Sequence, residues 1–361
     1  MRIGGRATRA IWLASDGVTV EVLDQTRLPY EVATLRLGGL DDACRAIRDM
    51  HVRGAPLIGA TAAYGLALAL RRDPSNAGLE RARAALAATR PTAVNLGWAL
   101  AEIARAVIDL APAARADAAY ARAAALCDED VALCRAIGQH GLALVRSAVE
   151  RTEGKRPVRV LTHCNAGWLA TVDWGTALAP IYAAHQAGIP IEVWVDETRP
   201  RNQGLLTAWE LGQEGVPHAV VADNAGGHLL QRGLVDLCIV GTDRTTARGD
   251  VANKIGTYLK ALAAHAAGVP FYVAAPGPSI DWTLEDGLAI EIEERSADEV
   301  LSVRGVAPDG RLTTVRIAPE GSGARNPAFD VTPAALVTAF VTERGVAPPS
   351  GLRALYGRAR G

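Results

Sequence analysis

The sequence lacks an excess of charge of either sign. Its 38 lysine and arginine residues are balanced by 39 aspartate and glutamate residues, which leaves a formal net charge of −1. A protein that binds nucleic acid or an anionic membrane through its overall charge carries a marked positive excess, so neither partner is expected. An anionic small molecule would have to be held by a local cluster of cations.

Long apolar runs are missing as well. No stretch is long and uncharged enough to cross a bilayer, and Arg6, Arg9 and Asp16 interrupt the N-terminal segment, so we expect a cytoplasmic protein. With 49% hydrophobic and 21% charged residues, the composition is that of a globular protein. A chain of 361 residues exceeds the usual size of one domain, and two domains are therefore expected.

Cysteine is scarce, and its spacing indicates neither a disulfide nor a metal site. The five cysteines form no CxxC pair, and Cys127 and Cys134 would lie ~10 Å apart along one helix. We predict that these two, Cys44 and Cys238 are core residues, whereas Cys164 has polar neighbours. The seven histidines lack ligand spacing, and the chain has no GxGxxG motif and no P-loop. We therefore expect no metal and no cofactor.

The first part of the chain predicts a small sheet followed by helices. Three β-like runs suggest an antiparallel sheet, at residues 11–14, 18–23 and 30–37. From about Leu40 to Val149, Ala, Leu and Arg recur at helical spacing, with breaks near Pro74, Pro91 and Pro112. Polar residues then follow as a linker, so we predict a first domain at 1–150 and a second at 151–361.

The second part alternates short buried strands with helices. The predicted strands are 158–162, 191–195, 219–222, 237–240 and 271–275, and the predicted helices are 175–188, 205–215, 251–268 and 332–344. This alternation indicates a mostly parallel sheet covered on both faces. The predicted class is thus α/β, with a small N-terminal antiparallel sheet and a helical domain before a parallel-sheet C-terminal domain.

Polar residues follow three of these strands at the point where each strand ends. Residues 163–167 follow the first strand, 196–204 the second and 241–244 the fourth, with Asn253 and Lys254 predicted to open the next helix. Ligands of parallel sheets bind beyond the carboxyl ends of the strands. These loops therefore predict an active site on one rim of the sheet.

Three of these rim residues could take part in acid–base chemistry. Cys164 follows a strand among small residues, a setting that can lower a thiol pKa, and its neighbours His163 and Asn165 argue against a purely apolar environment. Asp243 is either an acid/base group whose pKa burial raises or a structural residue that pairs with Arg244 or caps a turn. We interpret His163 as a hydrogen-bonding brace under the loop rather than a second acid/base group.

Cations beside predicted helix starts favour a phosphate ligand. Arg53 comes just before Pro56, which suits the first turn of a helix, so backbone amides and a guanidinium would face the same anion. Arg90 likewise precedes a predicted helix, and Lys254 adds a third cation. One such residue would be an ordinary surface charge, but three of them indicate a phosphate site.

Seven motifs occur in an order that resembles the methylthioribose-1-phosphate isomerase family, from about Asp24 to Gly345. They are Arg53-Gly54-Ala55-Pro56, Asn95-Leu96, Thr162-His163-Cys164-Asn165, Glu197-Thr198-Arg199-Pro200 with Gln203-Gly204, Asp243-Arg244, Gly249-Asp250 with Asn253-Lys254-Ile255-Gly256-Thr257-Tyr258, and Ala328-Phe329-Asp330-Val331-Thr332-Pro333. The same superfamily contains isomerases of 5-deoxyribose 1-phosphate and ribose 1,5-bisphosphate, and regulatory subunits of the eukaryotic initiation exchange factor.

The resemblance implies a function, an assembly and a set of site residues. It implies a two-domain homodimer with a Rossmann-like C-terminal domain and no metal or cofactor, which converts S-methyl-5-thio-α-D-ribose 1-phosphate into S-methyl-5-thio-D-ribulose 1-phosphate in methionine salvage. It makes Cys164 and Asp243 catalytic. It assigns substrate binding to Arg53, Gly54, Ala55, Arg90, Gln203, Asn253 and Lys254.

Three departures from the family pattern leave the substituent on the sugar's C5 open. Gln203-Gly204 runs directly into Leu205, while Thr242 and Arg248 stand where other residues are usual. The alternatives are thus an isomerase of 5-deoxyribose 1-phosphate or ribose 1,5-bisphosphate, or a non-catalytic regulatory subunit on the same fold. The sequence does not decide between proton transfer through an enediol, which we favour, and a hydride shift.

Overall fold

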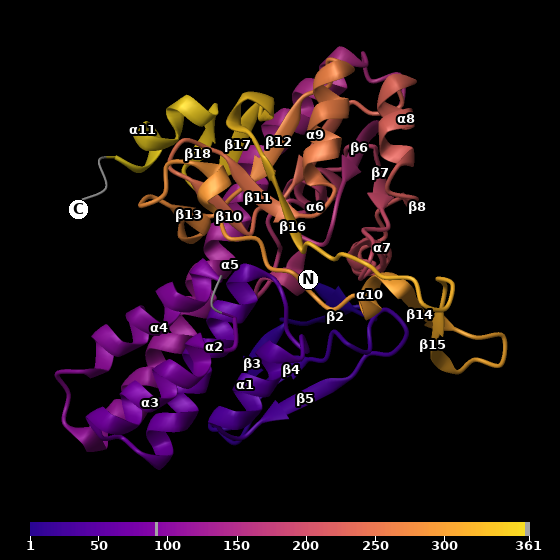
Figure 1. The fold of residues 1–361 in the computed structure, drawn as a ribbon. Coiled ribbons are helices and arrows are strands. Elements are labelled where there is room, and N and C mark those ends of the chain that lie inside the picture. Colours follow the sequence, from indigo (N-terminus) through magenta and orange to yellow (C-terminus); the bar gives the residue numbers. More distant parts are fainter. Residues whose placement is uncertain (91–92, 358–361) are drawn as a thin grey trace.

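The computed structural model describes residues 1–90 and 93–357, and its first part is a bundle of helices with a small sheet beside it (Figure 1). The helices are α1 (Leu40–Arg48), α2 (Ala55–Arg72), α3 (Asn76–Ala87), α4 (Val94–Val107) and α5 (Pro112–Arg151). The sheet is antiparallel, with β3 (Ile11–Leu13), β4 (Val20–Leu23) and β5 (Thr34–Leu37), and β1 (Arg2–Ile3) pairs with β2 (Arg6–Ala7). These elements confirm the small sheet and the helical region, while Pro91 lies outside the described residues.

Helix α2 lies at the centre of the bundle because it is apolar on nearly every side. It packs against α1, α3, α4 and α5, and a helix that is hydrophobic all round must be surrounded. Helix α5 extends from this bundle to the second part of the chain, where it packs against α6 (Ala179–Gln186) (Figure 1). It ends at Arg151, shortly before β6 (Val158–Thr162). The division into domains at residues 150 and 151 stays a prediction.

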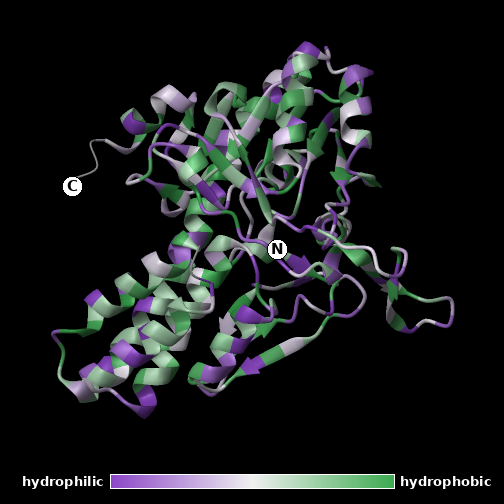
Figure 2. Ribbon diagram, in the orientation of Figure 1, coloured by the Kyte–Doolittle hydropathy of each residue, from purple (hydrophilic) through white to green (hydrophobic). Residues whose placement is uncertain are grey.

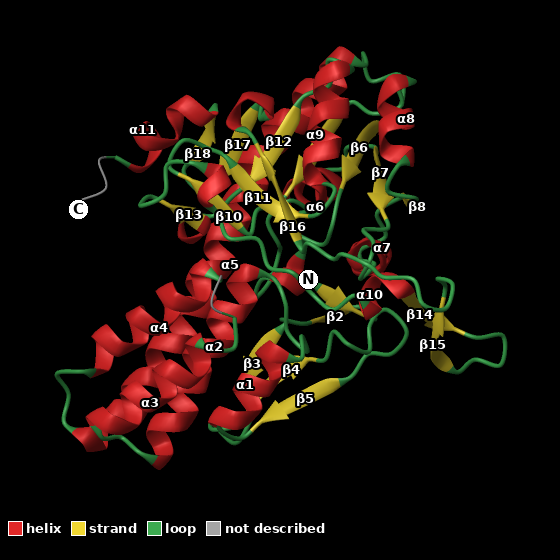
Figure 3. Ribbon diagram, viewed as in Figure 1, coloured by secondary structure: helices red, strands yellow, loops and turns green. Residues whose placement is uncertain are grey.

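The second part is built on a seven-stranded sheet in the order β18-β17-β12-β9-β6-β7-β8. Its strands are β6, β7 (Ile191–Asp196), β8 (His218–Val221), β9 (Leu237–Val240), β12 (Phe271–Ala274), β17 (Ala339–Thr342) and β18 (Gly345–Ala347), and all neighbours are parallel except β17 and β18. The remaining helices of this sheet are α7 (Gln203–Gln213), α8 (Ala225–Gln231) and α9 (Thr257–Ala266) (Figure 3). The parallel α/β architecture predicted from the sequence is confirmed.

Alternate residues of the parallel strands enter two different cores. Val158 and Val160 pack in the core that the sheet shares with α2 and α5, whereas Leu161, Cys238 and Phe271 pack in a core on the α8–α9 side. Both faces of each strand are thus buried, which explains why these strands are mostly hydrophobic (Figure 2). Cys44, Cys127, Cys134 and Cys238 are all buried, as predicted.

One predicted helix is wrong and another is confirmed only in part. The predicted helix 251–268 contains α9 (Thr257–Ala266), but its first four residues form β11 (Val251–Lys254), so Asn253 and Lys254 lie on a strand. The predicted helix 332–344 contains only a 3₁₀ turn, Ala334–Leu336, before β17. Short apolar runs fit either a buried strand or a helix segment, and here the pairing with distant strands decides. The predicted helix 175–188 is reduced to α6.

A four-stranded sheet that the sequence did not indicate lies beside the parallel one. Its order is β13-β10-β11-β16, with β10 (Arg244–Thr246), β13 (Ile280–Asp281) and β16 (Phe329–Thr332), and β11 pairs antiparallel with β16. A hairpin, β14 (Ser302–Val306) with β15 (Leu312–Arg316), follows the short helix α10 (Asp298–Leu301), and α11 (Leu352–Tyr356) comes after the last strand. Among the described residues, no helix is long and apolar enough to span a membrane.

Candidate active site

The order of the parallel strands reverses between β6 and β9. From β6 the chain proceeds through β7 to β8 on one side, and β9, β12 and β17 follow on the other. Ligands of open α/β sheets bind outside the carboxyl ends of the strands at such a switch point. Cys164 follows β6 and Asp243 follows β9, so the two predicted catalytic residues stand on either side of it.

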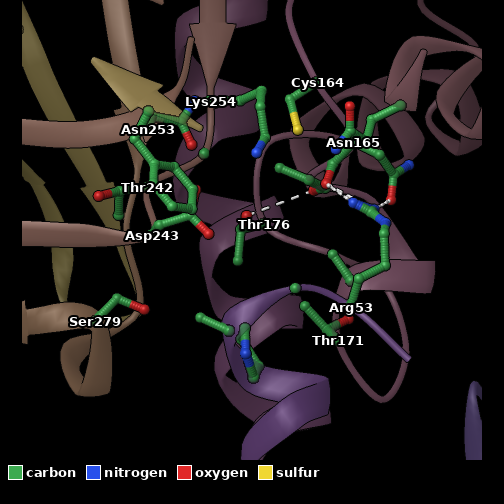
Figure 4. A pocket seen from close by; sticks show the side chains of 18 of the residues that line it. Arg53, Cys164, Asn165, Thr171, Thr176, Thr242, Asp243, Asn253, Lys254 and Ser279 are labelled. Carbon is green, nitrogen blue, oxygen red and sulfur yellow. Dashed lines mark hydrogen bonds between the residues drawn. The ribbon is translucent and has the colours of Figure 1, made fainter. Parts of the chain in front are cut away.

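A pocket at this point brings together side chains from both parts of the chain (Figure 4). It is lined by all nine residues that the sequence singled out: Arg53, Gly54, Ala55, Arg90, Cys164, Gln203, Asp243, Asn253 and Lys254. The helical part contributes the first three and Arg90, and the parallel-sheet part contributes the others. The pocket therefore exists only when the two parts pack together.

Twelve further residues line the pocket. Pro56, Asn165, Ala166, Gly241 and Thr242 belong to segments that the sequence had already placed at the site, whereas the sequence gave no site role to Met50, Ala170, Thr171, Thr176, Pro276, Ser279 and Phe329. Pro276 and Ser279 follow the carboxyl end of β12, so the same strand-end rule would have found them. Thr171 and Phe329 follow no strand of the parallel sheet and gave no such signal.

Cys164 is buried, with 8% of its surface exposed. Burial raises the pKa of its thiol, while the charges of Arg53 and Lys254 act in the opposite direction. The expectation that the strand end lowers this pKa was wrong, because the loss of water outweighs the nearby cations. Figure 4 shows the sulfur and the Lys254 ammonium pointing into the same cavity.

Asp243 faces the pocket instead of pairing with its neighbour in sequence. Arg244 turns away and donates from Nε to Asp281 Oδ2 at 3.0 Å. Burial raises the pKa of the Asp243 carboxyl, as predicted, and Lys254, Arg90 and Arg53 oppose that rise. A carboxyl with a raised pKa keeps its proton at a higher pH than a free aspartate does, which suits an acid/base group.

The three cationic side chains that are predicted to bind the phosphate differ in the contacts that they already make with other residues. Arg90 Nη2 lies 3.2 Å from Glu293 Oε2. Lys254 Nζ lies 4.3 Å from the centre of the Phe329 ring, and burial lowers the pKa of this ammonium. Arg53 donates through Nη1 and Nη2 to the Asn165 carbonyl at 3.3 and 3.1 Å, and its buried Nε has no hydrogen-bond partner in the described structure.

Backbone geometry places the start of α2 against the pocket. Gly54 has a φ of +88°, a left-handed value that favours glycine, and Pro56 stands in the first helical turn, as the sequence predicted. Gly54 has no side chain with which to cap the helix. The amides of the first turn thus keep the positive end of the helix dipole beside Arg53.

A buried carboxylate organises the loop that binds Arg53. Glu210 on α7 is fully buried and accepts hydrogen bonds from Asn165 Nδ2 at 2.8 Å, from the amides of Trp168 and Leu169, and from Tyr182 Oη at 3.0 Å. Because Glu210 takes the amide nitrogen of Asn165, the Asn165 side-chain oxygen is left to accept from Arg53. The sequence gave no signal for this role, since Glu210 sits within an ordinary amphipathic helix.

The titration of Glu210 leads to a testable pH dependence. Burial raises the pKa of Glu210 from 4.5 to about 7. Between these values the folded protein keeps a proton that the unfolded chain has lost, so this group's contribution to the free energy of unfolding falls as the pH rises. We expect that, from about pH 5 to about pH 7, Glu210→Gln gains stability relative to wild type, because glutamine cannot ionise.

Urea unfolding across that pH range measures this difference. Glu153→Gln is the matched control because Glu153 is exposed. The variant also loses a hydrogen-bond acceptor, which shifts its stability by the same amount at every pH. A difference between wild type and Glu210→Gln that stays constant with pH contradicts the assignment.

His163 is a brace, as predicted. Its ring is 1% exposed, with Nδ1 at 2.9 Å from Asp196 Oδ2 and Nε2 at 2.8 Å from the Ile255 carbonyl. Asp250 also braces loops, since its carboxylate accepts from the amides of Gly287 and Ala334. Asn253 donates from Nδ2 to Thr257 Oγ1 at 3.0 Å.

Within residues 1–90 and 93–357, one group of side chains lies close enough to share a metal ion. Ligand atoms of His163, Asp196 and Asp223 lie within 4.8 Å of one another. However, Lys260 Nζ lies 3.2 Å from Asp196 Oδ2, and the Asp223 carboxylate accepts from the amides of Thr198 and Arg199. The lysine ammonium already supplies positive charge at this place, so the group fits a metal poorly.

Comparisons with known proteins agree on one family. The family model described as the initiation factor 2 subunit family matches residues 51–349. A relative from Rhodospirillum centenum, named methylthioribose-1-phosphate isomerase, is 61% identical over 360 residues, which cover 99% of this chain and 96% of that protein.

Two solved structures share the fold over nearly their whole length. The 5-methylthioribose 1-phosphate isomerase of Pyrococcus horikoshii matches with a TM-score of 0.82 and 39% identity, covering 97% of this chain and 96% of that one. Subunit delta of the translation initiation factor eIF-2B from A. fulgidus matches with a TM-score of 0.78 and 36% identity, covering 97% and 99%.

Proposed function

The chain belongs to the initiation factor 2 subunit family, and from this premise and its pocket we infer that it is an aldose–ketose isomerase of a sugar 1-phosphate. It converts S-methyl-5-thio-α-D-ribose 1-phosphate into S-methyl-5-thio-D-ribulose 1-phosphate, a step of methionine salvage. The main support for the site assignment is that all nine predicted residues line one pocket.

The substrate determines what this pocket has to do. Phosphate on the anomeric oxygen prevents the sugar from opening to a free aldehyde, so the C1–O4 bond must break while C1 stays bonded to the phosphate. A hydrogen then moves from C2 to C1, which reduces C1 and oxidises C2 within one molecule. The reaction needs proton donors and acceptors and a held phosphate, and it consumes no external oxidant or reductant.

Cys164 and Asp243 supply the donor and the acceptor in this proposal. Both face the pocket from opposite sides of the switch point, and burial raises the pKa of both groups. Each therefore holds a proton more readily than it would in water and can return it to the ring oxygen or to a carbon. The exclusion of water that raises these pKa values also protects the ring-opened sugar.

The phosphate is assigned to the cationic side of the same pocket. Arg53 Nε, which has no hydrogen-bond partner among the described residues, is assigned to the anion together with the amides at the start of α2 and the Lys254 ammonium. Arg90 lies beside them, held by Glu293. Gln203 and Asn253 are assigned to the sugar hydroxyls, because both carry amide groups that are buried at the pocket wall.

Replacing Arg53 tests the phosphate assignment. Arg53→Ala is expected to raise KM by about 10- to 100-fold, which corresponds to the loss of one or two charge-assisted hydrogen bonds. The value of kcat should fall less, because the phosphate is unchanged during the reaction. Steady-state kinetics in both directions measures this split, and the exposed Arg48→Ala is the control. A loss confined to kcat, with KM unchanged, assigns Arg53 to the chemistry instead.

Activity is expected to survive exhaustive chelation. Cationic side chains and the amides at the positive end of a helix dipole face the pocket, and together they provide the positive charge that a metal would bring. The measurement is turnover of a chelator-treated preparation whose metal content has been analysed. If activity disappears and returns only with added magnesium or manganese, Asp196 and its neighbours have to be reassigned as metal ligands.

Two further properties belong to the same proposal. We propose a cytoplasmic enzyme, supported by its metabolic substrate, and a homodimer, as the family resemblance implies. Sedimentation of the purified protein at several concentrations tests the dimer. A monomer at all concentrations contradicts it.

The choice of substrate is tested with three sugars. Purified protein is incubated separately with methylthioribose 1-phosphate, 5-deoxyribose 1-phosphate and ribose 1,5-bisphosphate, and ketose formation is followed. We expect the first to have the highest kcat/KM. Turnover of none of the three favours the alternative of a non-catalytic regulatory subunit on the same fold, and one neighbour in structure is named as subunit delta of translation initiation factor eIF-2B.

A further inference from the structure

His163 is the only residue between strand β6 and Cys164. Both nitrogens of its ring lie within hydrogen-bonding distance of another residue. Nε2 faces the Ile255 carbonyl at 2.8 Å, and because a carbonyl can only accept, Nε2 carries a hydrogen. Nδ1 lies 2.9 Å from Asp196 Oδ2, within hydrogen-bonding distance. The orientation of the imidazole is therefore fixed.

The partner Asp196 is itself held in place. It ends strand β7, is fully buried and lies 3.2 Å from the ammonium of Lys260. Lys260 also donates to the backbone carbonyl of Asp223. The ion pair with Lys260, which is itself hydrogen-bonded to Asp223, holds the Asp196 carboxylate in a defined position beside the imidazole.

The other end of the imidazole joins two sheets. His163 follows β6 of the seven-stranded sheet, whereas Ile255 follows β11 of the four-stranded sheet, and no strand of one sheet pairs with a strand of the other in the described structure. Ile255 comes directly after Lys254, as Cys164 comes directly after His163. The bond from Nε2 to the Ile255 carbonyl thus connects the segment that carries the thiol to the segment that carries the ammonium.

Cys164 needs such support because its backbone is strained. Its φ is +66°, in the left-handed region that residues with a Cβ rarely adopt. Its amide donates to Thr198 Oγ1 and its carbonyl accepts from Thr207 Oγ1, both at 2.8 Å. Such a conformation persists only where the surroundings hold it, and the fixed ring of His163 is the adjacent support.

Glycine at position 256 leaves room for this ring. A Cβ on Gly256 would lie 2.8 Å from His163 Cε1, closer than packed atoms allow. The φ of Gly256 is +104°, which also favours glycine. Position 256 therefore provides a second way to disturb the imidazole without changing the imidazole itself.

We propose that His163 is a positioning residue, which fixes the Cys164 thiol relative to the Lys254 ammonium without touching the substrate. This proposal rests on the proposed function, because it assigns His163 a part in the same proton-transfer site. It goes beyond a brace of the fold, since it predicts effects on the thiol and on kcat that loss of packing alone does not produce.

The first test compares two substitutions that differ in one hydrogen bond. His163→Leu removes both bonds, whereas the amide of His163→Gln can still donate to the Ile255 carbonyl. We expect kcat to fall about 10- to 100-fold in His163→Leu, as for a misplacement of about 1 Å. KM should change less than about threefold, and His163→Gln should recover much of the loss. His140→Leu is the control, since His140 bonds the Thr342 carbonyl away from the pocket.

The second test needs no turnover. The charged groups that face the thiol are Arg53, Lys254 and Asp243. If Lys254 moves away, the pKa of Cys164 rises, and the midpoint of its alkylation by iodoacetamide against pH should rise by about one unit. Mass spectrometry separates Cys164 from the four other cysteines. Because this assay uses no sugar, it tests the positioning even if the wild type turns over none of the substrates.

The outcomes separate the two roles. The proposal is overturned if folded His163→Leu keeps both kcat and the alkylation midpoint of wild type. It is also overturned if His163→Gln and His163→Leu lose activity equally, because packing rather than the hydrogen bond would then be responsible. If His163→Leu fails to fold, Gly256→Ala replaces it in both tests. The added Cβ should displace the imidazole, lower kcat and raise the pH midpoint of Cys164 alkylation. An unchanged midpoint in Gly256→Ala overturns the proposal.

Discussion

Asp243→Asn and Cys164→Ser are each expected to lower kcat by about 10²- to 10⁴-fold, the range typical of a lost acid–base group. Asparagine keeps the shape of the carboxyl but cannot give up a proton, and serine replaces the thiol by a much weaker acid. Both side chains stand at the switch point with a pKa raised by burial. Single-turnover and steady-state kinetics measure the loss.

The fold should be unaffected by these two substitutions. Burial raises the pKa of Asp243 because its ionised form is costly to desolvate. Asparagine does not ionise, so the free energy of unfolding should stay the same or rise. Thr242→Ser is a suitable control because Thr242 lines the pocket and has no assigned step. Near-normal turnover by folded Asp243→Asn contradicts the role given to this carboxyl.

Gly54→Ala is expected to lower the free energy of unfolding by about 3 kcal/mol and to abolish most activity. A Cβ at position 54 would lie 2.3 Å from the Ala170 carbonyl oxygen and 2.5 Å from its Cα. These are backbone atoms that cannot rotate away. The segment around Gly54 would have to move off Ala170, and Arg53 would leave Asn165 with it.

Gly17→Ala separates this clash from backbone strain. Gly17 also has a positive φ, +69°, but no atom of the described residues lies within 4 Å of its added Cβ. It should lose only about 1 kcal/mol. Urea unfolding of both variants gives the comparison, and equal losses contradict the close approach at Ala170.

The parallel strands could be predicted because burial on both faces gives them a simple pattern. Runs such as 237–240 contain only apolar residues and are bounded by turn residues. The strand-end rule then located Cys164 and Asp243, since the carboxyl ends of parallel strands share one rim. The rule needs no knowledge of packing, which is why the sequence was sufficient for these residues.

The features that the sequence could not predict depend on residues that are distant in the sequence and close in the fold. β11 is a strand because β16, more than seventy residues later, pairs with it, and nothing near Val251 indicates that pairing. Glu210 supports Arg53 only through Asn165. The pKa of Cys164 depends on how completely water is excluded, which local composition does not fix.

The most direct test of the central claim is the formation of the ketose from methylthioribose 1-phosphate by chelator-treated wild type, with Asp243→Asn and Cys164→Ser assayed in parallel. We predict that the wild type produces S-methyl-5-thio-D-ribulose 1-phosphate without added metal and that each variant loses at least about a hundredfold of that rate. Absence of the ketose with the folded wild type, or undiminished turnover in the two variants, contradicts the account.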